Sequence, residues 1–314
     1  MNKLSIIIPV YYNEDTLQDL YEDLCEKVLD KLDDYEIVMV DDGSKDSSWT
    51  VMNEIRQKNP SHIKCVHLSR NFGEHSAILA GLNVCTGDCA VTKQADMQEE
   101  SELILRMYES WKKGNKVVLA VREDRDDGKI YQVFANLYYK LMRKIVNPEM
   151  PKGGFDCYLL DRKVIEVIKM LDEKNSALTL QVLWVGFKSE KIYFSRKARE
   201  KGKGRWTMAK KIKLVVDSVM SFSYFPVRLM SIMGIIFSLA SFIGIIMCIS
   251  EIVVSGVRTV GWASLMTVLL FSSGVMMLML GMLGEYVWRA LDASSNRPPF
   301  LIEEIVDENT TESD

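Results

Sequence analysis

Five short polar segments of the chain combine residue types that can bind a metal-bound diphosphate. Carboxylates and side-chain amides are the oxygen ligands that hard divalent cations prefer, and arginines hold phosphate through charge-assisted hydrogen bonds. Each segment alone is also compatible with a solvated turn, and Asp-Asp-Gly-Ser is a common turn sequence. The segments are Pro9–Glu14, Asp41–Ser44, Ser69–Gly73, Gln94–Gln98 and Arg122–Glu123.

Each polar segment follows an apolar run of strand length. The runs cover 4–10, 36–40, 63–68, 88–92 and 116–121, and stretches with helical apolar spacing lie between them. This alternation predicts an α/β fold with a parallel sheet that helices cover on both faces. Ligands of such sheets bind outside the carboxyl ends of the strands. The five polar segments are therefore expected at one edge, where they form a single site.

Several function classes lack their sequence signatures. No glycine-rich dinucleotide fingerprint and no phosphate-loop motif is present, which argues against a dehydrogenase or a P-loop nucleotidase. The six cysteines and three histidines have no zinc-like spacing, so we expect reduced, mostly buried thiols. No nucleic-acid partner is expected.

The later part of the soluble region has a less regular pattern. Residues 130–146 predict an amphipathic helix, 162–171 a further helix and 186–195 a further strand. Residues 208–220 predict a basic amphipathic helix that lies at a membrane interface. The alternative is that this helix packs onto the soluble domain.

Two long uncharged stretches predict a transmembrane hairpin. Leu229–Ser250 has 22 consecutive residues without Asp, Glu, Lys or Arg, and Thr259–Gly284 has 26. About 20 apolar residues are enough to span a bilayer, and a buried core helix seldom stays uncharged on every face for so long. Gly274, Gly281 and Gly284 permit close helix contact, either between the two spans or between subunits of a homo-oligomer.

Charges around the hairpin predict its orientation. The connecting loop offers only Arg258, whereas Arg289 and Arg297 follow the second span. The residues before the first span include Lys197, Arg199, Lys201, Lys203, Arg205, Lys210, Lys211, Lys213 and Arg228. Positive flanks stay in the cytoplasm. The predicted organisation is a cytosolic domain at 1–207, an amphipathic juxtamembrane segment at 208–228, a two-helix hairpin at 229–288 and a disordered acidic tail at 289–314.

The motifs together resemble the inverting family 2 glycosyltransferases. The motifs are Ile6–Tyr11, Val40–Ser44, Leu68–Gly73 and Ala95–Gln98. Over about residues 4–290, including the two-helix tail, the chain looks most like the polyprenyl-phosphate glycosyltransferases, the dolichyl-phosphate-mannose-synthase-like group. The resemblance implies a Rossmann-like GT-A fold, a nucleotide-sugar donor and a polyprenyl-phosphate acceptor. It also implies Mg²⁺ or Mn²⁺ as cofactor, the inner membrane as location and cell-envelope polysaccharide biosynthesis as setting.

The resemblance also implies roles for single residues. Pro9, Tyr11 and Glu14 would line the nucleoside pocket, Asp41 would bind the base and Asp42 would lie near the ribose. Asp156 aligns with the proposed catalytic aspartate, and Arg122 with an arginine near the diphosphate. Arg199, Lys203 and Arg205 resemble a basic loop before the membrane. The metal motif falls on Gln94, Asp96 and Gln98, and Asp96 also counts as a catalytic residue.

Two positions depart from the family pattern. Gln94 stands in place of the first aspartate of the metal motif, and an amide oxygen can ligate a cation without adding negative charge. Tyr158 stands in place of an arginine, so one expected phosphate contact is absent. These departures keep two alternatives open besides transfer to polyprenyl phosphate. One is transfer to another membrane glycolipid or glycan, and the other is a non-catalytic membrane partner that retains the fold.

Overall fold

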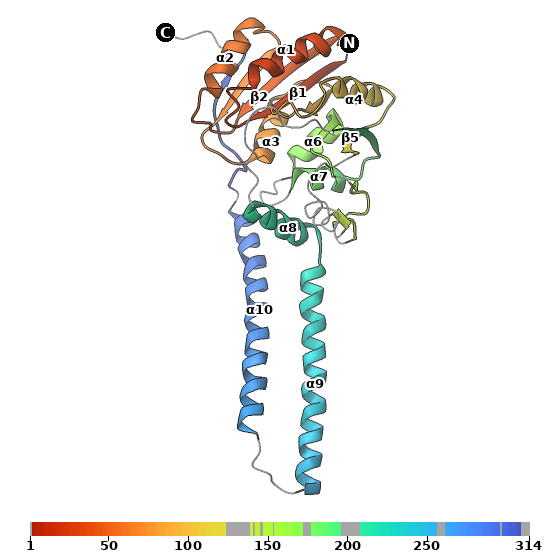
Figure 1. Cartoon of the computed structure of the whole chain (residues 1–314), viewed down its shortest axis with the longest axis vertical. Helices are drawn as coiled ribbons and strands as arrows, with labels where there is room; N and C mark the ends of the chain where they lie inside the picture. Colours follow the sequence, from red (N-terminus) through yellow and green to blue (C-terminus); the bar gives the residue numbers. More distant parts are fainter. Residues whose placement is uncertain are drawn as a thin grey trace. The chain divides into compact units, whose positions relative to one another are not determined.

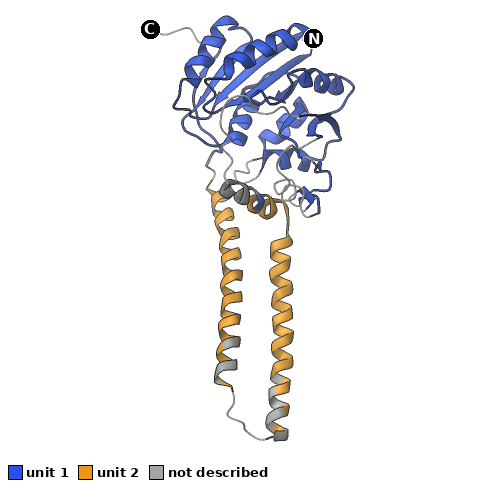
Figure 2. Ribbon diagram, in the orientation of Figure 1, with its two compact units in different colours: residues 1–215, 298–314 blue, residues 216–297 orange. Residues whose placement is uncertain are grey.

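The computed structural model of the chain describes residues 2–123, 139–140, 142–144, 147–152, 154–171, 177–195, 208–255, 261–295 and 297–308. The chain forms two compact units, one of residues 1–215 with 298–314 and one of residues 216–297 (Figure 2). Most of the predicted helix at 130–146 lies outside the described residues.

One mostly parallel sheet of eight strands forms the first unit, with the order β7-β5-β6-β4-β1-β2-β3-β8 (Figure 1). Neighbours β1, β2, β3 and β4 run parallel, and so do β5 and β7, whereas β6 and β8 are antiparallel to their neighbours. This confirms the predicted α/β class. The strands are β1 (Lys3–Val10), β2 (Asp34–Asp41), β3 (Ile63–Leu68), β4 (Cys89–Thr92), β5 (Val117–Arg122), β6 (Cys157–Asp161), β7 (Ser189–Phe194) and β8 (Ile302–Val306).

Helices cover both faces of the sheet because its central strands are apolar on both sides. Leu24, Met52 and Met107, from α1, α2 and α4, pack into one core with Ile6 and Ile8. On the opposite face α3 approaches β1 closely, and a Cβ at Gly81 would lie 2.5 Å from Ile7 Cγ2. The helices of this unit are α1 (Leu17–Lys27), η1 (Leu29–Lys31), α2 (Ser48–Lys58), α3 (Glu74–Val84), α4 (Glu102–Lys112), α6 (Arg162–Lys169) and α7 (Leu178–Trp184).

The last strand corrects one prediction. We expected residues 289–314 to be disordered, but β8 pairs antiparallel with β3 and α10 continues to Ser294. Without β8, β3 would be an edge strand with unpaired backbone groups. Val306 is buried, and the Asp307 carbonyl accepts a 3.2 Å hydrogen bond from Arg56 Nη1. The segment looked disordered because its acidic residues Glu303 and Glu304 suit a charged outer strand as well as a tail.

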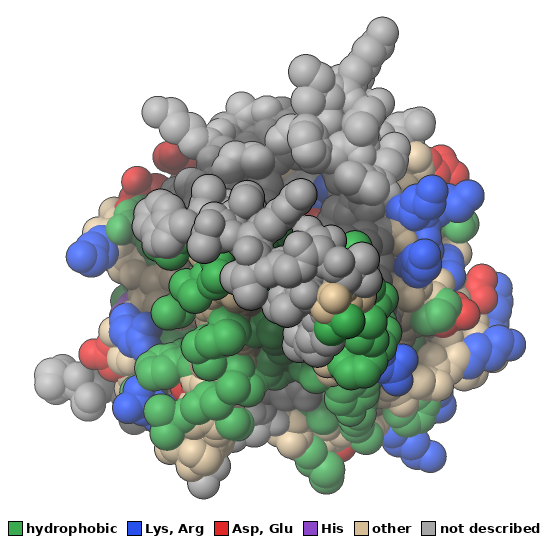
Figure 3. Space-filling model, turned by 90° about the horizontal axis from the view of Figure 1, so that it is seen from below, with side chains coloured by type: hydrophobic (Ala, Val, Ile, Leu, Met, Phe, Trp, Pro, Cys, Tyr) green, Lys and Arg blue, Asp and Glu red, His purple; other side chains and the backbone are tan. Residues whose placement is uncertain are grey.

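The second unit consists of two long helices and the end of α8 (Met208–Phe222). Both α9 (Phe225–Ser255) and α10 (Trp262–Ser294) are long and apolar enough to cross a membrane. Their large hydrophobic side chains are exposed, and such side chains gather on this unit in the end-on view of Figure 3. An exposed apolar surface of this size fits a lipid environment.

Two contacts inside the second unit link its helices. The Phe237 and Phe271 rings, on α9 and α10, have centroids 5.5 Å apart. Arg289 Nη2 of α10 lies 2.6 Å from Asp217 Oδ1 of α8, and Arg289 Nε donates to Glu285 Oε1 at 3.0 Å. The pairing of Arg289 with two carboxylates ties the start of this unit to the end of its second long helix.

Candidate active site

The parallel strands bring the five polar segments to one edge of the sheet, as predicted. Because β1, β2, β3 and β4 run in the same direction, their carboxyl ends lie at the same edge. β6 is antiparallel to both β4 and β5, so β5 also ends at that edge. The residue before β6, Asp156, comes to the same edge from the opposite chain direction.

Two adjacent carboxylates, Asp41 at the end of β2 and Asp42 directly after it, are both buried. Asp41 is 0% exposed, and its Oδ2 lies 2.8 Å from His67 Nδ1 at the end of β3. Asp42 accepts hydrogen bonds from the backbone N–H groups of Phe72, at 2.7 Å, and Gly73, at 2.9 Å. The loops after β2 and β3 are thereby tied together through Asp42, to which the family resemblance gave a place near the ribose.

The environment of Asp42 disfavours its charge. Burial raises the pKa of Asp42 to about 6, and the neighbouring Asp41 and Glu74 carboxylates add to this against the two backbone hydrogen bonds. Gly43 makes the close approach of the two loops possible. It has a φ of 65°, and a Cβ there would lie 2.5 Å from the Arg70 carbonyl carbon.

The loop after β1 contacts the loop after β2 through hydrogen bonds from backbone N–H groups. Tyr12 N donates to Ser44 Oγ at 2.9 Å, and Tyr12 has a φ of 56°. Pro9 is buried in β1, and Tyr11 N donates to Asn13 Oδ1 at 3.0 Å. The exposed Glu14 accepts a 2.8 Å hydrogen bond from Ser47 N before α2. Of the predicted nucleoside-side residues, Pro9 thus lies in β1, and Tyr11 and Glu14 lie in the loop after it, which contains the strained Tyr12.

The predicted metal motif forms a tight turn after β4. Gln98 N donates to Asp96 Oδ1 at 3.3 Å, and Met97 between them has a φ of 57°. Left-handed backbone at a methionine is costly and concentrates at functional sites. Among the described residues, Tyr12 and Met97 are the two non-glycine residues with positive φ, and both lie at the carboxyl edge.

The donor chemistry of this turn fits a hard divalent cation. Asp96, Gln94 and Gln98 offer oxygen atoms, which Mg²⁺ and Mn²⁺ accept together with diphosphate oxygens. In the described part of the chain, no group of three His, Cys, Asp or Glu side chains is placed to hold a metal by itself. Gln94 donates through Nε2 to Glu74 Oε1 at 2.6 Å.

Arg122 and Asp156 form an ion pair at the end of β5. The last antiparallel pair is Ala120 with Cys157, so the same register carried one residue further sets Asp156 opposite Val121, next to Arg122. The Arg122 side chain is 13% exposed and that of Asp156 is 44% exposed, so the carboxylate faces open space. Tyr158 is buried, and its hydroxyl has no hydrogen-bond partner among the residues that the structure describes.

Two residues of this edge were not predicted for the site. Glu74 contacts the metal motif, and its position directly after the Ser69–Gly73 segment was the available signal. His67 lies between Asp41 and the β8 residue Glu303, whose Oε2 is 3.8 Å from His67 Nε2. No sequence signal pointed to His67, since its partner Glu303 belongs to the segment expected to be disordered.

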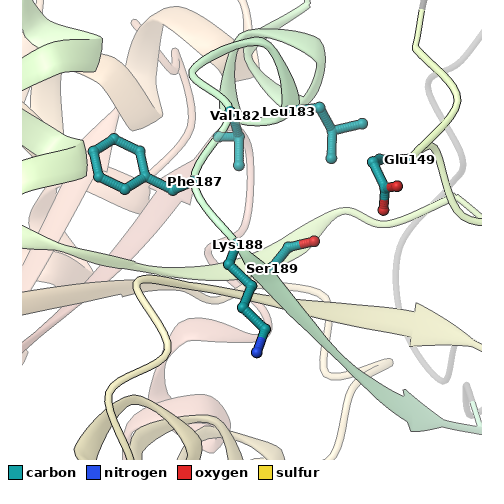
Figure 4. Close-up of a pocket in the computed structure, with 7 residues that line it drawn as sticks. Glu149, Val182, Leu183, Phe187, Lys188 and Ser189 are labelled. Carbon is teal, nitrogen blue, oxygen red and sulfur yellow. The ribbon is translucent and has the colours of Figure 1, made fainter.

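Some predictions fall outside this geometry. Arg199, Lys203 and Arg205 lie outside the described residues, and their proposed phosphate role stays a prediction. A separate pocket of about 300 Å³ lies between α7 and the start of β7 (Figure 4). Its lining contains none of the predicted site residues and consists of Glu149, Val182, Leu183, Gly186, Phe187, Lys188 and Ser189.

Known proteins resemble the chain over nearly its whole length. Residues 5–227 match the model of glycosyl transferase family 2. The uncharacterized glycosyltransferase YkcC of Bacillus subtilis is 35% identical over 95% of this chain and 93% of its own length. A prophage bactoprenol glucosyl transferase homolog of Escherichia coli is 32% identical over 96% of this chain and 99% of its own length.

A third relative extends this likeness to phages. The bactoprenol glucosyl transferase of Shigella phage SfX is 33% identical over 96% of this chain and 98% of its own length. These matches include the region of the two long helices as well as the sheet. The chain belongs to glycosyl transferase family 2 and is a glycosyltransferase.

Proposed function

We propose that the protein transfers a sugar, with inversion, from a nucleotide-diphosphate sugar to polyprenyl phosphate at the cytoplasmic face of a membrane. The observation that carries this proposal is the likeness to bactoprenol glucosyl transferases across 96% of the chain, spans included. A purely soluble acceptor would give no reason for the two apolar helices.

The nucleoside end of the donor fits the buried pair after β2. Asp41 is held by His67 and by Ser44 N, which donates at 3.2 Å to Asp41 Oδ1, so its carboxylate has a defined direction. An ionised Asp42 can accept a hydrogen bond from a ribose hydroxyl. Pro9 at the end of β1, with Tyr11 and Glu14 in the loop after it, would border the same pocket.

The diphosphate end fits the segments after β4 and β5. Asp96, Gln94 and Gln98 would hold Mg²⁺ or Mn²⁺, which neutralises charge on the leaving diphosphate when bound. Arg122 would stabilise the same charge from the other side. Arg199, Lys203 and Arg205 would add positive charge for the lipid phosphate.

The reaction is a displacement at the anomeric carbon of the sugar. A phosphate oxygen of the acceptor forms the new bond to that carbon, while the bond to the diphosphate oxygen breaks and the nucleoside diphosphate leaves. The acceptor oxygen is already anionic near neutral pH, so no general base is required. Asp156, held by Arg122, would stabilise positive charge on the sugar or orient the acceptor.

The orientation rests on the distribution of positive charge. Lysines and arginines crowd the flank before the first span, and Arg289 and Arg297 follow the second, whereas the loop between the spans has Arg258 alone. By the positive-inside rule both flanks, and the catalytic unit with them, face the cytoplasm. Nucleotide sugars and polyprenyl phosphate would then meet on the same side of the membrane.

Full-length protein in detergent tests the proposal with undecaprenyl phosphate and radiolabelled UDP-, GDP- and dTDP-sugars. We expect one donor to give a lipid-extractable product whose anomeric configuration is inverted in NMR spectra. Asp96→Ala should abolish the product. Hydrolysis alone, or label in a different glycolipid, would contradict the proposed acceptor. Unchanged membrane glycosylation and nucleotide affinity in Asp96→Ala would favour a non-catalytic partner.

A further inference from the structure

The carboxylate of Glu74 lies against the residue that departs from the metal motif of the family. Glu74 opens α3, directly after the loop that follows β3, and Gln94 follows β4. Gln94 Nε2 donates to Glu74 Oε1 at 2.6 Å. This contact joins two loops of the carboxyl edge whose residues are 20 apart in sequence.

The contact determines which way the Gln94 amide faces. An ionised carboxylate only accepts hydrogen bonds, so the NH₂ group of Gln94 must face Glu74. The carbonyl oxygen of Gln94 lies in the same amide plane, on the other side of the Cγ–Cδ axis, and so points away from Glu74. A charge-assisted hydrogen bond of this kind is short and strong, and it polarises the amide, which makes its oxygen a better ligand.

The same carboxylate also borders the second departure from the family pattern. Burial raises the pKa of Tyr158 well above its ordinary value, and the Glu74 charge adds to this, so the hydroxyl keeps its proton. The family pattern has a negative aspartate and a positive arginine where this chain has neutral Gln94 and neutral Tyr158. Gln94 and Tyr158 therefore both interact with the charge of Glu74, a residue outside the metal motif.

We propose that Glu74 is a positioning residue of the donor site, which acts through Gln94. It turns the Gln94 oxygen toward the divalent cation and supplies the negative charge that an aspartate at position 94 would carry. Carboxylates play this role behind metal-ligating histidines, where they orient the ligand and raise its basicity. The inference rests on the proposed function, since it assumes a metal-bound nucleoside diphosphate at this edge.

The experiment measures Mn²⁺ binding to full-length protein in detergent, with UDP or GDP present, by the EPR signal of free Mn²⁺. We expect Glu74→Gln to raise the Mn²⁺ dissociation constant roughly 10–100-fold. Nucleotide affinity in EDTA should stay at the wild-type value, because Glu74 acts on the cation. Glu102→Gln is the matched control, since Glu102 is likewise the acidic residue in the first turn of a helix, α4. It should leave Mn²⁺ binding unchanged.

A second pair of variants separates positioning from a general structural effect. Gln94→Leu removes the amide but leaves Glu74, and it should lose as much Mn²⁺ affinity as Glu74→Gln. Introducing Gln94→Asp into Glu74→Gln returns one negative charge to the motif and should restore most of the affinity. If Glu74→Gln lowered Mn²⁺ affinity by damaging α3, the Gln94→Asp substitution after β4 would not restore that affinity. The thermal unfolding midpoint of each variant tests for such damage directly.

The outcomes distinguish this inference from the proposed function. Wild-type protein that binds none of UDP, GDP and dTDP, with or without Mn²⁺, would overturn the proposed function and this inference together. Mn²⁺-dependent nucleotide binding that Glu74→Gln leaves intact would overturn the inference alone. So would a double variant, Glu74→Gln with Gln94→Asp, that binds Mn²⁺ as weakly as Glu74→Gln.

Discussion

Strand β2 has a buried carboxylate near each end, and the two have opposite properties. Glu36, near its start, accepts hydrogen bonds from Ser5 Oγ at 2.6 Å and Gly87 N at 3.1 Å. Its Oε2 also lies 3.4 Å from Lys64 Nζ. Asp42, just past the end of β2, has two backbone donors and two neighbouring carboxylates.

The partners explain the difference in pKa. Burial alone would raise the pKa of Glu36, but the hydrogen bonds and lysines outweigh burial and lower it to about 2. For Asp42, burial prevails and the pKa rises to about 6. The amino edge of the sheet thus satisfies its buried charge within the protein. The carboxyl edge leaves negative charge that a cation and ligand hydroxyls can satisfy, which is what a metal–nucleotide site requires.

The largest effect is expected at Asp156. In the proposed mechanism Asp156→Asn removes a negative charge that would stabilise positive charge on the sugar, and it should lower the transfer rate about 10²–10³-fold. Its side chain is largely open, so stability should change little. Single-turnover transfer and donor binding are the measurements. A loss of donor affinity as large as the loss of rate would assign Asp156 to ground-state binding instead.

At the amino edge of the sheet, we expect substitution of Glu36 to change the stability of the fold. Glu36→Gln is expected to destabilise the protein by about 2–4 kcal/mol at pH 7, because each unit of pKa shift is about 1.4 kcal/mol. A lowered pKa gives stability that is present above pH 4.5 and is lost as pH falls toward about 2. The gap between variant and wild type should therefore close over this window in denaturant unfolding. A gap that is constant with pH would contradict the electrostatic explanation.

Donor binding should depend on pH through Asp42. The carboxyl is protonated below pH about 6 and ionised above it. A charged acceptor strengthens a hydrogen bond by about 1 kcal/mol, so nucleoside diphosphate affinity should rise about fivefold from pH 5 to pH 7. The pH dependence of folding stability has the opposite direction. Because the folded state raises the pKa of Asp42, ionising this group costs stability as pH rises through 6. Calorimetry in buffers of different ionisation enthalpy measures the number of protons exchanged on binding. An affinity that does not change between pH 5 and pH 7 would contradict the role of Asp42.

The smallest effects are expected around His67. His67→Ala removes one of the contacts that hold the buried Asp41, and should weaken donor binding roughly three- to tenfold. Glu303→Gln is the matched variant on β8 and should change affinity less than about twofold, because that pair is exposed and 3.8 Å apart. Equal losses in both variants would mean that β8 itself takes part in donor binding.

The sequence predicted the parts of the site that depend on strand direction. Five apolar runs were expected as strands, and they form β1, β2, β3, β4 and β5 with their carboxyl ends together. The segment with Asp156 was identified by resemblance alone, because the short strand β6 was not expected. Its contact with Arg122 follows from antiparallel register, which no local pattern reveals.

Local patterns in the chain determined the class of fold, the edge of the sheet that holds the site and the two apolar helices. Apolar periodicity and runs without charge are properties of neighbouring residues, so the sequence displays them directly. Only the tertiary structure decided that β8 returns to pair with β3, that His67 meets Asp41 and that Glu74 meets Gln94. These contacts join segments that are distant along the chain, and the packing of the whole sheet brings them within hydrogen-bond distance.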